Sequence, residues 1–201
     1  MVQVADVVFD VGRVLVDFRY DSFARILRER GAELSGPEDF LARVDLVGYE
    51  RGEIGSDDFL VQLNGLMRDP LPREDLVAAW RDLFTPIPEM LELAGKLKAH
   101  CGVYLLSNTS ELHWQHLKQV YALEGICHDL LASYEVGLMK PAGDIYAVAC
   151  ERFGLEPATT VFVDDREENV SGAIACGWHG VWHRDIPTTR AQLSRLTGVD
   201  L

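Results

Sequence analysis

Short apolar runs alternate with amphipathic stretches along much of the chain, and this alternation predicts its fold. The runs stop abruptly at polar or turn residues, which is typical of buried strands in a parallel sheet. They cover residues 7–9, 102–107, 129–133, 160–163 and, with a weaker pattern, 179–183. The segments between them carry apolar residues at helical spacing. Strands and helices in alternation indicate an α/β fold with a doubly wound parallel sheet and right-handed crossovers.

Residues 18–86 interrupt this alternation with helical stretches that follow one another directly. Pro37 suits a first helical turn, and Ser56 suits an N-cap. The pattern predicts four helices with no strand between them, at residues 18–30, 37–47, 56–66 and 72–84. We therefore expect an inserted four-helix unit at residues 18–86 and an α/β core formed by residues 1–17 and 87–201.

Charge and composition narrow the class of protein. The chain has 201 residues and a net charge of −13, which argues against nucleic-acid binding because phosphate backbones need clustered Lys and Arg. No basic segment precedes the first apolar run, which Asp6 and Asp10 interrupt, so we expect neither a signal peptide nor a membrane helix but a cytoplasmic protein. The cysteines lack C-x-x-C spacing and are expected to be buried free thiols. They are Cys101, Cys127, Cys150 and Cys176.

Polar residues that could carry chemistry stand at the ends of the predicted strands. Carboxyl ends of parallel strands meet at one edge of a sheet, where open α/β folds bind their ligands. Carboxylates there suit a hard cation such as Mg²⁺, and one of them could act as a nucleophile. A hydroxyl, backbone N–H groups and an ammonium neutralise phosphoryl oxygens. The residues concerned are Asp10, Ser107, Asn108, Lys140, Asp164 and Asp165.

These residues occur in short motifs that resemble, in order, the four motifs of the haloacid dehalogenase superfamily. The motifs are Asp10-Val-Gly-Arg-Val14, Ser107-Asn108, Lys140-Pro141 and Asp164-Asp165. The resemblance implies a Rossmann-like core and identifies the helical insertion as a C1-type cap. The first motif and the cap phrase Glu50-Arg-Gly-Glu-Ile54 are similar to the branch of α-D-glucose-1-phosphate phosphatases.

The resemblance also implies roles for individual residues. Asp10 would be the nucleophile that becomes an aspartyl phosphate. Mg²⁺ would be held by Asp10, the backbone carbonyl of Gly12 and Asp165, with Asp164 nearby.

Three further residues would bind the phosphoryl group. Ser107 and the backbone N–H of Asn108 would contact its oxygens, and Lys140 would neutralise its charge while pairing with the carboxylates. The implied activity is that of a Mg²⁺-dependent phosphatase acting on a small phosphorylated metabolite, such as a sugar phosphate.

The first motif departs from the superfamily pattern at one position. Most superfamily phosphatases carry a second Asp two residues after the nucleophile, as general acid and base, and here that residue is Gly12. The next residue, usually glycine, is Arg13, whose guanidinium does not give up its proton. A Tyr or Glu of the cap is the next candidate. Residues expected to reach the substrate are Arg13, Tyr49, Glu50 and Arg51.

Two other functions compete with the phosphatase. A non-catalytic phosphate-binding protein is consistent with the missing second Asp. A 2-haloacid dehalogenase shares the nucleophile but needs no metal and lacks the adjacent Asp164-Asp165 pair. Outside these motifs, His113 and His116 are expected on a solvated helix face rather than in a metal site.

Overall fold

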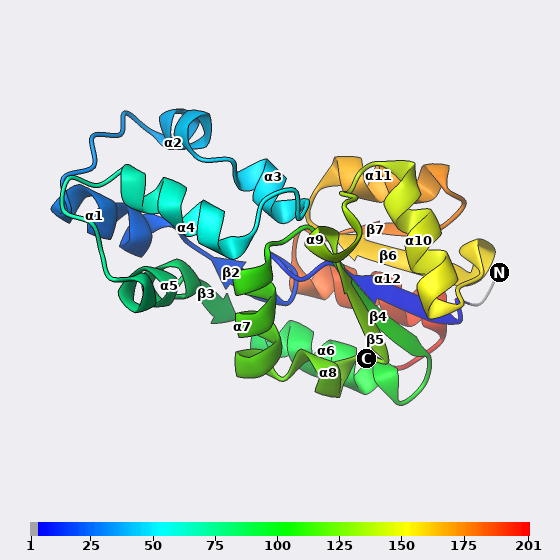
Figure 1. Ribbon diagram of the computed structural model, residues 1–201. Coiled ribbons are helices and arrows are strands. Elements are labelled where there is room, and N and C mark those ends of the chain that lie inside the picture. Colours follow the sequence, from blue (N-terminus) through cyan, green and yellow to red (C-terminus); the bar gives the residue numbers. More distant parts are fainter. Residues whose placement is uncertain (1–3) are drawn as a thin grey trace.

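The computed structural model describes residues 4–201 and contains a five-stranded parallel sheet (Figure 1). The strand order is β5-β4-β1-β6-β7, with β1 in the centre, and the predicted doubly wound α/β core is confirmed. Phe9 at the end of β1 is in register with Leu105 of β4 and Val163 of β6, so the carboxyl ends of these strands lie together. The strands are β1 (Asp6–Phe9), β4 (Gly102–Ser107), β5 (Asp129–Ala132), β6 (Thr160–Asp164) and β7 (His179–Trp182).

Helices cover both faces of this sheet, because successive residues of each strand point to opposite sides. Val7 and Phe9 pack in one apolar cluster with α6, α7 and α12, whereas Val8 packs in another with α10 and α11. The helices of the core are α6 (Pro88–Lys98), α7 (Glu111–Tyr121), α8 (Leu123–Ile126), α9 (Ser133–Val136), α10 (Gly143–Phe153), the 3₁₀ turn η1 (Pro157–Thr159), α11 (Glu167–Ala175) and α12 (Ile186–Thr197).

The inserted segment contains five helices rather than the four expected. A single helix over residues 37–47 was wrong, because Val44 is extended and Asp45 starts a new helix. The Asp45 carboxylate caps that helix by accepting a hydrogen bond from the Gly48 N–H at 2.8 Å. The five helices are α1 (Asp21–Glu29), α2 (Pro37–Arg43), α3 (Leu46–Glu50), α4 (Ser56–Gly65) and α5 (Arg73–Arg81).

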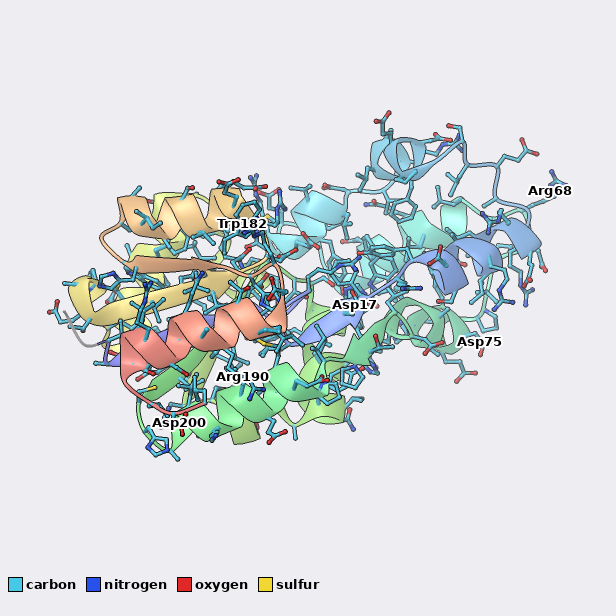
Figure 2. The ribbon with its side chains drawn as sticks, turned by 180° about the vertical axis from the view of Figure 1, so that it is seen from behind. Asp17, Arg68, Asp75, Trp182, Arg190 and Asp200 are labelled. Atoms are coloured by element: carbon cyan, nitrogen blue, oxygen red, sulfur yellow. The ribbon has the colours of Figure 1, made fainter. Side chains whose placement is uncertain are left out.

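The inserted helices have an apolar core of their own, centred on aromatic side chains. Trp80 of α5 is fully buried and contacts Phe23 and Phe59 at ring-centroid distances of 5.0 and 5.1 Å. Leu112 of α7 joins this cluster from the core side. Figures 1 and 2 show the inserted helices beside the sheet, at the end where β1 and β4 finish.

A two-stranded antiparallel sheet, absent from the sequence prediction, connects the two parts. It pairs β2 (Val16–Phe18) with β3 (Phe84–Pro86), so both chain crossings run through it. Asp17 of β2 lies at this junction in Figure 2. Strands of three residues are too short to give an alternating pattern, which explains why the sequence suggested helix ends here.

Two smaller expectations concern the cysteines and the membrane. All four cysteines are free thiols, as predicted, but Cys127 alone is buried and the other three are partly exposed. Within the described residues 4–201, no helix combines the length and apolarity needed to cross a bilayer.

Candidate active site

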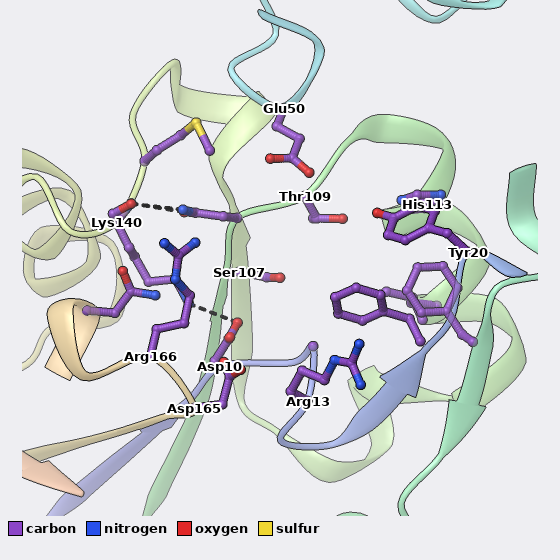
Figure 3. Close-up of a pocket in the computed structure, with 17 residues that line it drawn as sticks. Asp10, Arg13, Tyr20, Glu50, Ser107, Thr109, His113, Lys140, Asp165 and Arg166 are labelled. Carbon is purple, nitrogen blue, oxygen red and sulfur yellow. Dashed lines mark hydrogen bonds and ion pairs between the residues drawn. The ribbon is translucent and has the colours of Figure 1, made fainter. Parts of the chain in front are cut away.

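The ends of β1, β4 and β6 open into a pocket of about 210 Å³ that the inserted helices cover from one side (Figure 3). The structure brings residues from all four predicted motifs into this lining, and of the predicted core residues Asp164 is not part of it. The core supplies these lining residues from its strands, its loops and α11: Asp10, Gly12, Arg13, Ser107, Asn108, Thr109, Met139, Lys140, Asp165, Arg166 and Asn169. The remaining lining residues come from the helical insertion, the two-stranded sheet β2-β3 and α7: Phe18, Tyr20, Glu50, Phe84, His113 and Leu117.

Asp10 follows β1 directly and is only 8% exposed. One carboxylate oxygen, Oδ1, accepts a hydrogen bond from the Val11 N–H at 2.7 Å and lies 2.8 Å from Lys140 Nζ. Burial raises the pKa of Asp10 to about 7, against the opposing effect of the Lys140 charge. Further positive charge in the pocket would therefore favour the ionised, nucleophilic form of Asp10.

Lys140 is buried between two carboxylates. Its ammonium group lies 2.8 Å from Asp10 Oδ1 and 2.7 Å from Asp164 Oδ2, and it donates to the Leu106 carbonyl at 2.9 Å. Burial alone would lower the pKa of Lys140, but the charges of Asp10 and Asp164 raise it above its ordinary value. The lysine thus stays charged beside the nucleophile.

The adjacent aspartates Asp164 and Asp165 have different surroundings. Asp164 is fully buried, and its oxygens accept hydrogen bonds from the Arg166 N–H at 2.8 Å and from Asn169 Nδ2 at 3.0 and 3.1 Å, in addition to the Lys140 ion pair. Asp165 instead lines the pocket next to Asp10 (Figure 3). Asp164 therefore orients its neighbours, and Asp165 presents a carboxylate to the pocket.

The donor set fits a hard divalent cation. Asp10, Asp164 and Asp165 each bring a carboxylate oxygen within 4.8 Å of the others. No described residue donates a hydrogen bond to the Gly12 carbonyl. Asn169 Oδ1, which sequence reasoning missed, is buried in the pocket wall without a hydrogen-bond partner among the described residues. Unpaired buried acceptors are rare, and a cation or its bound water would satisfy them.

Ser107 ends β4, and Asn108 and the unpredicted Thr109 follow it; all three line the pocket. The Ser107 side chain points into the space beside Asp10 (Figure 3). Asn108 is engaged with the Lys140 backbone: its Nδ2 donates to the Lys140 carbonyl at 2.9 Å, and its Oδ1 accepts from the Lys140 N–H at 2.9 Å. Ser107 is therefore available to a ligand, whereas the Asn108 side chain holds Lys140 in place.

The cap residues expected at the site have different positions. Glu50 lines the pocket, but Tyr49 and Arg51 do not. Tyr49 is buried, with its hydroxyl 2.8 Å from Ser56 Oγ and accepting a hydrogen bond from the Leu112 N–H at 3.1 Å, so it joins the insertion to α7. Arg51 is exposed.

Arg13 lines the pocket, in a backbone conformation that is uncommon for a residue with a side chain. Its φ is +61°, in the left-handed region. The guanidinium group pairs with Asp17 at 2.5 Å and stacks over the Phe18 ring at 4.4 Å. These contacts hold Arg13 against strand β2 at one side of the pocket.

The expectation of a solvated face at His113 was wrong. His113 is buried, stacks on Trp80 at 4.6 Å and has Nε2 2.9 Å from the Trp80 carbonyl. Burial lowers the pKa of His113 to about 4. His116 is partly exposed. No local pattern marks His113, because its partner lies on α5 in the inserted segment. Tyr20 and Arg166 also line the pocket, and the sequence analysis missed both.

Comparison with known families agrees with this geometry. A model of the haloacid dehalogenase-like hydrolases matches residues 7–177. The chain therefore belongs to the haloacid dehalogenase-like hydrolase family, as its four motifs predicted. Its relatives include named phosphatases, and the prediction of a phosphoric monoester hydrolase is confirmed at this level.

Three curated relatives illustrate the range of the family. A D-ribitol-5-phosphate phosphatase from Bacteroides thetaiotaomicron is 29% identical, over 83% of this chain and 85% of its own length. A sesquiterpene phosphatase from Aspergillus oryzae is 29% identical, over 75% of this chain and 78% of its own. An (S)-2-haloacid dehalogenase from Burkholderia cepacia is 28% identical over a shorter stretch, 54% of this chain and 47% of its own.

The fold has close counterparts among solved structures. A haloacid dehalogenase family enzyme from Bacteroides thetaiotaomicron, in complex with magnesium and inorganic phosphate, matches with a TM-score of 0.80 and 25% identity. The match covers 89% of this chain and 93% of that protein.

Proposed function

We propose that this protein is a Mg²⁺-dependent phosphatase that hydrolyses a small phosphorylated metabolite, such as a sugar phosphate, through an aspartyl-phosphate intermediate on Asp10. The observation that carries the proposal is the buried Asp10–Lys140 pair at 2.8 Å, in a pocket that also contains Asp165 and the Ser107 hydroxyl. The proposal treats residues 1–17 and 87–201 as the catalytic core and residues 18–86 as a cap over it.

Asp10, Asp165 and the Gly12 carbonyl would hold the metal, with Asn169 Oδ1 as a further acceptor and Asp164 behind them. When bound, Mg²⁺ supplies positive charge that offsets repulsion between the phosphate and the carboxylates. The magnesium and phosphate bound together in the Bacteroides thetaiotaomicron enzyme support this assignment.

The residues of the chain would divide the reaction as follows. Ser107 donates a hydrogen bond to a phosphoryl oxygen, and the Lys140 ammonium, held by Asp164 and Asn108, faces the same group. A carboxylate oxygen of Asp10 attacks phosphorus as the bond to the leaving oxygen breaks. Water then attacks the phosphorus of the aspartyl phosphate and regenerates the Asp10 carboxylate.

Two alternatives remain distinct outcomes of one experiment. Gly12 favours a non-catalytic phosphate binder, because the usual acid and base is missing from the first motif. The second alternative, a 2-haloacid dehalogenase, is supported by the similarity to the dehalogenase relative. The acidic cluster of Asp10, Asp164 and Asp165 favours the phosphatase, because its carboxylates could hold a metal ion and a dehalogenase needs none.

The test is a screen of phosphate esters with Mg²⁺ and with excess chelator. We expect phosphate release that disappears on chelation and returns with Mg²⁺. Asp10→Asn should abolish turnover without lowering the free energy of unfolding. The control Asp6→Asn, at the opposite end of β1, should retain turnover. Activity that persists in chelator, or halide release from 2-chloropropionate, would favour the dehalogenase; phosphate binding without turnover would favour the non-catalytic protein.

A further inference from the structure

Position 12 has no carboxyl group and little room for one. A Cβ atom at Gly12 would lie 3.1 Å from the Phe18 ring, which is itself held by Arg13 and by Phe84. A side chain at this position would therefore be crowded by the Phe18 ring, which would have to shift by a few tenths of an ångström. Because glycine carries no side chain, a side chain that exchanges protons with the substrate has to stand at another position.

Glu50 is the carboxyl group that the inserted helices supply to the pocket. The other carboxyl groups in its described lining, Asp10 and Asp165, belong to the acidic cluster of the core. The Glu50 side chain points from the end of α3 into the space above Ser107 and Thr109 (Figure 3). Its carboxyl group makes no hydrogen bond or ion pair with any described residue, so it is available to a ligand.

The backbone around Glu50 is fixed to the core. Ser133 of α9 donates a hydrogen bond from Oγ to the Glu50 carbonyl at 2.6 Å. Gly52, at φ +70°, lets the next turn approach α9 so closely that a Cβ atom there would lie 2.3 Å from the Tyr134 carbonyl oxygen. These contacts position Glu50 over the pocket rather than leave it on a free loop.

We propose that Glu50 is the general acid and base of the reaction, supplied by the cap in place of the carboxyl group missing at position 12. This inference rests on the proposed phosphatase function. In the first step the Glu50 carboxyl gives its proton to the leaving oxygen as the P–O bond breaks and the bond from Asp10 to phosphorus forms. In the second step the Glu50 carboxylate accepts a proton from the water that attacks the aspartyl phosphate.

The surroundings of Glu50 suit both roles. Burial raises the pKa of Glu50 to about 7, and the nearby Arg166 charge limits the rise, so both protonation states are accessible near neutral pH. The other charged or titratable groups lining the pocket are Asp10, Arg13, Tyr20, His113, Lys140, Asp165 and Arg166. The elements packed against α3 add Asp57 and Asp58 of α4 and Tyr134 and Glu135 of α9.

The test compares two esters of similar shape whose leaving groups differ in their need for a proton. The leaving oxygen of benzyl phosphate departs as an unstable alkoxide unless it receives a proton, whereas p-nitrophenyl phosphate releases a stable phenolate. Removing a general acid typically costs about 10²–10⁴-fold. Glu50→Gln should therefore lower kcat/KM for benzyl phosphate by about that factor and that for p-nitrophenyl phosphate by less than about tenfold. With p-nitrophenyl phosphate it should also give a burst of nitrophenol, because hydrolysis of the phosphoenzyme lacks its base.

The control is Glu53→Gln, in the same turn but exposed, which should behave as wild type. The wild-type kcat/KM for benzyl phosphate, divided by that of Glu50→Gln, should decline as the pH rises through about 7. The division cancels the ionisation of the substrate and of Asp10. Glu50→Asp keeps an ionisable group, so its kcat/KM for benzyl phosphate, divided by that of Glu50→Gln, should also decline as the pH rises.

Equal losses on both esters, or no loss on benzyl phosphate, would overturn the assignment of Glu50. A ratio independent of pH would do the same. The proposed function is judged separately: if wild type hydrolyses p-nitrophenyl phosphate and Asp10→Asn does not, the phosphatase stands whatever the Glu50 variants do.

Discussion

The contact between Gly52 and α9 gives a prediction whose size follows from the structure. Gly52→Ala places a side chain at φ +70°, where a residue other than glycine pays roughly 1–2 kcal/mol. It also puts a Cβ atom 2.3 Å from the Tyr134 carbonyl oxygen, well inside any tolerated contact. A backbone atom cannot rotate away, so the turn has to move off α9.

Movement of the turn breaks the Ser133–Glu50 hydrogen bond, which contributes about 0.5–1.5 kcal/mol. Together with the backbone strain, we expect the free energy of unfolding to fall by roughly 1.5–3.5 kcal/mol. Glu50 moves with the turn, so catalysis should weaken in the same manner as in Glu50→Gln, with benzyl phosphate more affected than p-nitrophenyl phosphate.

Urea denaturation and the two kcat/KM values measure both effects. Gly65→Ala is the matched control, because Gly65 ends α4 in open space without a positive φ. Alanine there should be neutral or stabilising by up to about 1 kcal/mol. An unfolding free energy for Gly52→Ala within about 0.5 kcal/mol of wild type would refute the close packing of this turn on α9.

Three further predictions concern ionisable residues in and around the pocket. Burial lowers the pKa of His113 to about 4, so as the pH falls the unfolded chain binds a proton before the folded chain does, and the free energy of unfolding decreases by about 3 kcal/mol in total between about pH 6.5 and pH 4. Urea denaturation at several pH values should show a smaller pH dependence for His113→Gln. The control His100→Gln, at an exposed position, should keep the wild-type pH dependence. Lys140→Met leaves two buried carboxylates unpaired and should cost about 3–5 kcal/mol at pH 7; a loss below about 1 kcal/mol would contradict this. Asp165→Asn should raise the Mg²⁺ concentration for half-maximal activity at unchanged order of substrate preference; an unaltered Mg²⁺ dependence would remove Asp165 from the metal site.

The sheet and the core of the site could be predicted because their signals are local. The runs at residues 102–107 and 160–163 match β4 and β6 closely, since buried strands are short, apolar and bounded by turn residues. Once the sheet is parallel, its strand ends must meet at one edge. The proximity of Asp10, Lys140 and Asp165 then follows from topology rather than from any single residue.

The contacts between the insertion and the core could not be predicted, because each joins residues far apart in the chain. His113 stacks on Trp80, and the Leu112 N–H bonds to the Tyr49 hydroxyl, but neither position differs in pattern from other helical residues. Tyr49 and Glu50 are neighbours in one short helix, yet one packs against α4 and α7 and the other faces the pocket. The angle at which α3 meets the core decides which of them reaches a ligand.

The first motif shows why a missing residue cannot be interpreted from its own position. In the sequence, Gly12 marks the absence of an acid and Arg13 the absence of a glycine. In the structure the two changes share one neighbour: the Phe18 ring lies 3.1 Å from where a Cβ at Gly12 would be and beneath the Arg13 guanidinium at 4.4 Å. An Asp at position 12 would require that ring to shift by a few tenths of an ångström. Position 12 is therefore crowded by the Phe18 ring and carries no side chain, whereas the Glu50 carboxyl of the cap already faces the pocket.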